Sequence, residues 1–89
     1  MDKIVGTTES GFEYRINKAE LDNMYLFDVI SDVDDGHLEK LPKLLTLLLG
    51  EEQKKKLYKH LEDENGHVSI EKCAKEVVEI LNSNQSTKN

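Results

Sequence analysis

Residues 61–72 place oxygen-bearing side chains at spacings similar to those of a calcium-binding loop. In the twelve-residue EF-hand pattern, carboxylate and amide oxygens form a shell of hard ligands, and a glycine makes the sharp central turn. Four residues match positions three, five, six and eight of this pattern: Asp63, Asn65, Gly66 and Val68. Position one, however, is Leu61, and position twelve is Lys72 in place of the bidentate glutamate. Because both of the strongest ligands are missing, we expect a turn between two helices rather than a calcium site.

The other polar groups also lack the spacing that catalysis or metal binding requires. Three aspartates follow a predicted helix, in an acidic loop of a kind that is usually solvated: Asp32, Asp34 and Asp35. The histidines have no zinc-ligand spacing with one another or with the single cysteine: His37, His60 and His67. Ser69 is better explained as a helix N-cap, and Cys73 as a small buried side chain. We therefore predict no catalytic residue, no metal site and no cofactor, and expect the protein not to be an enzyme.

The composition is that of one small acidic domain. The chain has 89 residues, a formal net charge of −6 at pH 7, 37% hydrophobic residues and 34% charged residues, as is typical of a globular protein. Nucleic-acid binding is disfavoured, because the dense basic run Lys54–Lys56 lies between acidic residues that can pair with it along a helix. The leucine-rich segment 38–49 is too short and too charged to cross a membrane. One cysteine and an N-terminus without a signal-like apolar core predict a cytoplasmic protein.

Local patterns predict a β-hairpin at the N-terminus, followed directly by a helix. Residues 4–16 contain a turn at Glu9–Gly11, after which apolar and polar side chains alternate as they do in a strand. Asn17 and Glu20 then have the spacing of a capping box, which opens a helix that ends near Ser31.

Three further helices are expected after this region. The first begins near His37 or at Pro42 and ends at Gly50, which also opens the next helix because glycine tolerates the left-handed cap conformation. The remaining two are expected at residues 51–64 and 70–82. The predicted fold is therefore mainly α: a small bundle of about four helices with an N-terminal β-hairpin. It forms a single domain over residues 1–82, and residues 83–89 are predicted to be a disordered polar tail.

Each predicted helix carries an apolar stripe for the core, and a few apolar residues lie outside these stripes. The stripe residues are Tyr25, Leu26, Val29, Ile30 and Val33; Leu38, Leu41, Leu44, Leu45 and Leu48; Leu57, Tyr58 and Leu61; and Ile70, Ala74, Val77, Val78 and Leu81. Surplus apolar residues on a small bundle either widen the core or form a surface for a partner. We predict that Met24, Phe27 and Leu47 form such a partner-binding surface, together with the edge of the hairpin.

Three stretches of the chain resemble a known family over about residues 7–82. They are TTESGFEYRIN, the acidic loop DVDDG, and LPKLLTLLLGEEQKKKLYKHLEDENGHVSIEKCAKEVVEIL. Together they resemble the small tail assembly chaperones of long-tailed phages and prophages of Gram-positive bacteria. The resemblance implies a non-catalytic protein of the host cytoplasm that coats the tape-measure protein and keeps it soluble. It also implies that the protein helps tail-tube subunits to polymerise, and that it leaves before the particle matures.

The partners implied by this resemblance are the tape-measure protein and the tail-tube protein, and a homo-oligomer is a further possibility. No nucleic acid and no membrane is expected as a partner. Two other readings of the sequence stay open: a degenerate EF-hand-like helical interaction module, and a small regulatory protein with a helix–turn–helix unit. A structural role in the finished virion is also compatible with the sequence.

Overall fold

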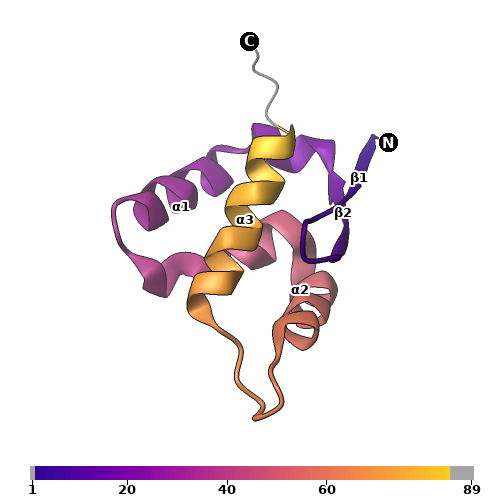
Figure 1. The fold of residues 1–89 in the computed structure, drawn as a ribbon. Coiled ribbons are helices and arrows are strands. Elements are labelled where there is room, and N and C mark those ends of the chain that lie inside the picture. Colours follow the sequence, from indigo (N-terminus) through magenta and orange to yellow (C-terminus); the bar gives the residue numbers. More distant parts are fainter. Residues whose placement is uncertain (1, 85–89) are drawn as a thin grey trace.

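A computed structural model describes residues 2–84 as a helical unit with an antiparallel β-hairpin at its N-terminus (Figure 1). The predicted class, mainly α with an N-terminal hairpin, is confirmed. In chain order the elements are β1 (Lys3–Thr7), β2 (Glu13–Asn17), the 3-10 helix η1 (Lys18–Asp22), α1 (Met24–Asp34), the 3-10 helix η2 (Leu38–Lys40), α2 (Leu41–Leu61) and α3 (Ile70–Asn84). In Figure 1, α3 crosses in front of α2, with α1 on one side and the hairpin on the other.

The hairpin forms where the alternating pattern predicted it. Its register places Val5 opposite Arg15, and the turn is closed by a hydrogen bond from the Thr8 N–H to the Phe12 carbonyl, at 2.9 Å. Gly11 has a φ of 96°, a conformation that residues with a Cβ rarely adopt. The alternation buries one face of β2 against the helices, where Ile16 is almost fully enclosed. This burial stabilises a two-stranded sheet that would be marginal alone.

The region after the hairpin differs from its prediction as one continuous helix. Asn17 caps only η1, since its Oδ1 accepts from the Ala19 N–H at 3.1 Å. The chain then becomes extended at Asn23, with a φ of −124°, and the Asn23 side chain caps α1 by accepting from the Tyr25 N–H at 3.0 Å. Glu20, predicted to complete a capping box, instead accepts from the Asn23 amide at 3.1 Å.

Three α-helices are present within residues 2–84, where the sequence predicted about four. The predicted helix break at Gly50 is confirmed, because its φ of 83° and ψ of 163° are not helical, and the helices on its two sides together form the kinked element α2. The second half of α2 ends at Leu61 rather than near Glu64, and a loop leads to α3. Ser69 caps α3 as predicted, accepting from the Lys72 N–H at 3.1 Å.

α3 is also longer than predicted, since Ser83 and Asn84 belong to it. The prediction of a disordered tail is therefore wrong for these two residues. The Asn84 side chain gives them an anchor, because its amide donates to the Ile80 carbonyl at 2.8 Å and to the Tyr14 hydroxyl at 3.0 Å. The rest of the predicted tail, residues 85–89, lies outside the described residues.

The core lies where the three α-helices and the inner face of the hairpin meet. Its most enclosed side chains are Ile16, Leu26, Leu44, Leu45, Leu57 and Ile80. Four residues assigned to core stripes are exposed instead: Tyr25, Leu38, Ile70 and Val78. Two of them have local reasons, because Leu38 belongs to the tighter turn of η2 and Ile70 is the first residue of α3. In α3 the buried stripe is Cys73, Glu76, Val77, Ile80 and Leu81, which has the spacing of one helix face.

Candidate functional site

Two of the three residues predicted to bind a partner are exposed at the start of α1. Met24 is 67% exposed and Phe27 is 61% exposed, while Leu26 and Val29 fix the opposite face of α1 in the core. Met24 and Phe27 are three positions apart, so they are neighbours on the helix surface. Tyr25, which was predicted to point inward, is exposed beside them. We call Met24, Tyr25 and Phe27 the α1 patch.

The third predicted residue, Leu47, belongs to a different environment. It lies on α2, is half-buried, and packs against the hydrophobic core. A polar substitution there would disturb packing, so Leu47 is mainly a core residue that the helical wheel had left unassigned. The α1 patch is therefore the exposed part of the predicted surface, and its binding of a partner stays a prediction.

The α1 patch lies on a strongly acidic stretch of the chain. Residues 19–36 contain six acidic residues and no lysine or arginine. One of these carboxylates, Asp32, pairs with Lys40 of η2 at 3.5 Å. A partner that covers the α1 patch would therefore meet apolar side chains on a segment rich in negative charge, which favours an apolar segment flanked by basic residues.

A second apolar feature, a recess of about 350 Å³, lies between η2, the first turns of α2 and the start of α3. Its apolar lining includes Leu38, Leu41, Pro42, Tyr58, Val68 and Ile70. Sequence reasoning missed this recess because it assigned both Leu38 and Ile70 to core stripes. The signal that could have found it is their position, since each lies at the beginning of a helical element and next to a loop.

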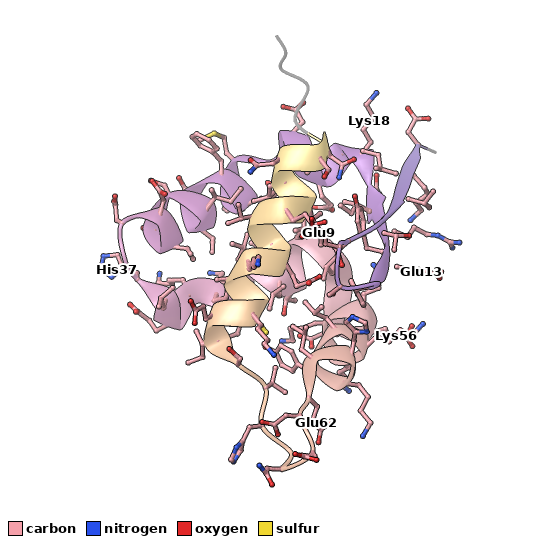
Figure 2. The ribbon with its side chains drawn as sticks, in the orientation of Figure 1. Glu9, Glu13, Lys18, His37, Lys56 and Glu62 are labelled. Atoms are coloured by element: carbon pink, nitrogen blue, oxygen red, sulfur yellow. The ribbon has the colours of Figure 1, made fainter. Side chains whose placement is uncertain are left out.

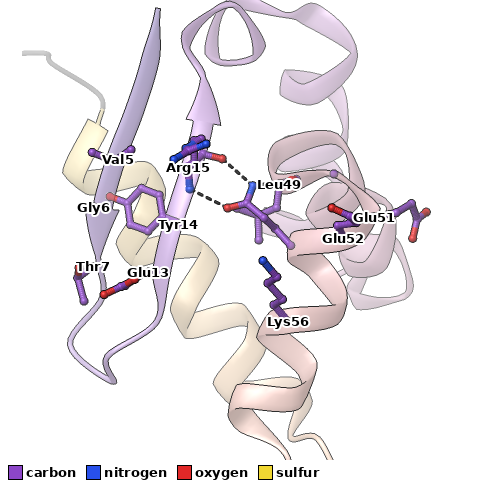
Figure 3. A pocket seen from close by; sticks show the side chains of 12 residues that line it. Val5, Gly6, Thr7, Glu13, Tyr14, Arg15, Leu49, Glu51, Glu52 and Lys56 are labelled. Carbon is purple, nitrogen blue, oxygen red and sulfur yellow. Dashed lines mark hydrogen bonds between the residues drawn. The ribbon is translucent and has the colours of Figure 1, made fainter.

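A larger and more polar groove, of about 910 Å³, lies between the hairpin and the second half of α2 (Figure 3). The kink at Gly50 turns this half of α2 so that Gln53 meets the backbone of β2. The charged groups that line the groove are Glu13, Arg15, Glu51, Glu52 and Lys56. Such a mixed lining has no strong preference for one sign of charge, and therefore favours no particular ligand.

A polar cluster joins the hairpin turn to α2 and α3. The Ser10 hydroxyl donates to Glu76 Oε2 at 2.7 Å, and the His60 Nε2 lies 3.0 Å from Ser10 Oγ and 3.1 Å from the Ser10 carbonyl oxygen. The Glu9 N–H donates to Glu79 Oε2 at 2.7 Å. Glu76 is only 5% exposed, and its Oε1 has no hydrogen-bond partner among the described residues.

The geometry of this cluster does not activate Ser10 as a nucleophile. A carbonyl oxygen can only accept, so the His60 Nε2 that contacts the Ser10 carbonyl carries the proton. The same nitrogen therefore cannot remove the proton of the Ser10 hydroxyl, as the base of a catalytic triad does. The cluster instead fastens the hairpin turn to two helices that are distant from it in the sequence.

The segment that imitates a calcium loop is closed by its own hydrogen bonds. Asp63 Oδ1 accepts from the Asn65 N–H at 2.8 Å and from the His67 N–H at 2.9 Å. Hydrogen bonds from His67 and then Asn65 hold the pKa of the Asp63 carboxyl below its ordinary value. The Asp63 side chain thus organises the turn by accepting hydrogen bonds from backbone N–H groups of the same turn. This role accounts for the partial match to the calcium pattern without a bound ion.

Cys73 and His37, the remaining candidates for chemistry, lie in separate parts of the molecule. Cys73 is buried, and this burial, followed by the negative charge of Glu76, raises the pKa of its thiol and disfavours the reactive thiolate. His37 points outward at the end of α1, on the side away from the hairpin in Figure 2. Residues 2–84 contain no group of three histidine, cysteine, aspartate or glutamate side chains placed to hold a metal ion. No helix in this part of the chain is long and apolar enough to cross a membrane.

Comparison of the chain with protein-family models, with curated proteins and with solved structures finds no match in any of the three.

Proposed function

We propose that this protein is a non-catalytic tail assembly chaperone of a phage or prophage, which binds the tape-measure protein and assists assembly of the tail tube in the host cytoplasm. The observation that carries the proposal is the α1 patch, in which Met24 and Phe27 are exposed on an otherwise acidic segment. Because residues 7–82 resemble such chaperones, we expect the client that binds the patch to be the tape-measure protein.

The physical requirements of a chaperone for a long apolar client agree with these features. Such a protein needs a small apolar surface that holds the client, and a charged remainder that keeps the complex soluble. The α1 patch meets the first requirement, and the net charge of −6 meets the second. Because the patch lies on a segment rich in negative charge, we expect it to hold apolar client segments that have lysine or arginine beside them.

Co-expression with the tape-measure protein encoded in the same gene cluster tests the proposal. The double variant Met24→Ser/Phe27→Ser removes the exposed apolar surface of the patch and leaves Leu26 and Val29 in the core. We expect copurification of the tape-measure protein to fall by about tenfold or more, as for loss of apolar anchor residues at other interfaces, and its soluble fraction to fall with it.

Val78→Ser is the matched control, because Val78 is an exposed apolar residue on α3, outside the patch. It should leave copurification unchanged, and circular dichroism should show that both variants are folded. Raising the salt concentration should weaken the wild-type complex, since the expected charge attraction is screened. If the double variant retains the client as well as the wild type does, the proposed surface is wrong.

A further inference from the structure

The two edges of the hairpin differ in how their backbone groups are used. In an antiparallel pair, successive residues of a strand direct their N–H and C=O groups alternately toward the partner strand and away from it. The Lys18 N–H donates to the Asp2 carbonyl, and the Thr8 N–H donates to the Phe12 carbonyl, both at 2.9 Å. The backbone N–H and C=O groups of the even-numbered residues of β1 therefore point toward β2. Lys3, Val5 and Thr7 direct their N–H and C=O groups outward.

The outer edge of β2 is already occupied. Arg15 is the residue opposite Val5, so its backbone groups also point away from the pair. Its N–H and its carbonyl both bond to the side-chain amide of Gln53, which lies against this edge much as a peptide group of a third strand would. No such group covers β1: within residues 2–84, the outward N–H and C=O groups of Lys3, Val5 and Thr7 form no hydrogen bond. β1 lies at the margin of the molecule in Figure 1.

We propose that this free edge of β1 pairs antiparallel with β1 of a second copy of the chain, so that two hairpins form one four-stranded sheet. A symmetric pairing centred on Val5 places Val5 opposite Val5 of the second copy, and Lys3 opposite Thr7 of the second copy. All residues in these pairs direct their backbone groups outward, so each pair exchanges two N–H···O hydrogen bonds. This interface does not depend on the proposed chaperone function.

The side chains of β1 favour a second copy as the occupant. Val5 is 68% exposed, and the pairing covers it with its own counterpart, a favourable β-branched contact on the outer face. No like charges meet, because Lys3 lies opposite a threonine. On the inner face, the half-buried Ile4 comes opposite Gly6 of the second copy. Gly6 has no side chain, because the Tyr14 ring of its own chain lies over it, so Ile4 meets no side chain on the residue opposite.

A short strand pair covers much less surface than a standard stable interface of about 1,600 Å², so we expect a weak dimer. Analytical ultracentrifugation of the full chain should give a mass that rises from monomer toward dimer between about 10 μM and about 1 mM protein. Val5→Pro removes the central outward N–H but no hydrogen bond between β1 and β2, and proline is tolerated at such edge positions. This variant should stay monomeric over the same range and keep the wild-type circular dichroism spectrum.

Val5→Thr is the matched control, since threonine keeps both the backbone N–H and the β-branched shape; it should still dimerise. A second readout, cysteine cross-linking, tests the register. Val5→Cys should form a disulfide-linked dimer readily, because the two Cα atoms of such a pair lie about 5.5 Å apart. Lys3→Cys should not cross-link with itself, because four residues separate the two positions along the strands, about 14 Å. It should cross-link when mixed with Thr7→Cys. The wild type controls for the buried Cys73.

A monomeric wild type at all these concentrations overturns the proposal, and it does so even if the edge binds a strand of another protein. Equal self-association of Val5→Pro and wild type also overturns it, as does equal cross-linking of Val5→Cys and Lys3→Cys alone.

Discussion

The side-chain amide of Gln53 forms two hydrogen bonds with the backbone of Arg15. The Arg15 N–H donates to Gln53 Oε1 at 2.7 Å, and Gln53 Nε2 donates to the Arg15 carbonyl at 2.6 Å. The same Nε2 lies 2.7 Å from the carbonyl oxygen of Leu49, the last residue before the kink at Gly50. One side chain thus joins the edge of β2 to the bend of α2, and holds the two walls of the polar groove together (Figure 3).

Replacing Gln53 by alanine should destabilise the protein by about 0.5–1.5 kcal/mol, because backbone groups of Arg15 and Leu49 lose their partner at positions that water can reach. Chemical denaturation followed by circular dichroism measures this change. Glu52→Ala is the control, since Glu52 is an exposed neighbour on α2, and it should change the free energy of unfolding by less than about 0.5 kcal/mol. Equal stability of the two variants would mean that the Gln53 bonds contribute nothing.

Replacing Gly50 by alanine should also destabilise the protein. Its φ of 83° and ψ of 163° fall in a region that is essentially restricted to glycine, so alanine costs about 1–3 kcal/mol unless the helix straightens. Thermal unfolding measures the loss. Lys55→Ala, an exposed substitution within α2, should leave the melting temperature nearly unchanged. A Gly50→Ala variant as stable as the wild type would show that α2 can run straight without cost.

Ser10→Ala should loosen the attachment of the hairpin turn. Glu76 would lose its hydrogen bond to the Ser10 hydroxyl and keep two buried carboxylate oxygens without a partner, at a cost of about 1–3 kcal/mol. Adding Glu76→Gln to this variant should recover part of the loss, because a neutral amide is less costly to bury than a charge. Denaturant unfolding of the single and double variants gives the comparison. If the double variant is the less stable of the two, buried charge is not the source of the loss.

The turn at Asp63 should depend on pH in the acidic range. Its carboxyl has a pKa below the ordinary 3.8 in the folded chain, because the N–H groups of His67 and Asn65 bond to the ionised form. A lowered pKa means that the turn gains its full stabilisation above about pH 3.8 and loses it as the pH falls through the folded value. NMR shifts of the two amides should report this titration. Asp63→Asn should abolish it, and an amide titration that persists in that variant would assign it to another group.

Much of the fold follows from local signals that act over a few residues. The alternation of apolar residues from Phe12 to Ile16 correctly predicts a strand, and Ser69 correctly predicts the start of α3. Asn17, by contrast, was recognised as a cap but assigned to the wrong helix. The competing signal was Asn23, whose extended conformation ends η1 and opens α1. Both asparagines satisfy the capping rule, and each does cap a helix: Asn17 caps η1 and Asn23 caps α1.

The exposure of Met24 and Phe27 could be predicted, because the faces of α1 can be assigned from its own periodicity. That these two residues bind a partner stays a prediction. The half-burial of Leu47 could not be predicted, because a helical wheel describes one straight helix, whereas a neighbouring element decides whether a flanking residue is covered. The apolar recess beside Leu38 and Ile70 could not be found in this way, because residues 38–45, Tyr58 and residues 68–73, which are separate in the sequence, form its walls.

The leucines of α2 illustrate the division between sequence and tertiary structure. The spacing of Leu41, Leu44, Leu45 and Leu48 determined by itself that this segment is a helix with one face in the core, because a period of 3.6 residues is a property of the chain alone. The break at Gly50 was likewise predictable, because glycine tolerates the non-helical conformation found there. What the second half of α2 contacts was decided only in three dimensions, because Gln53 binds the backbone of Arg15, a residue 38 positions away in the sequence.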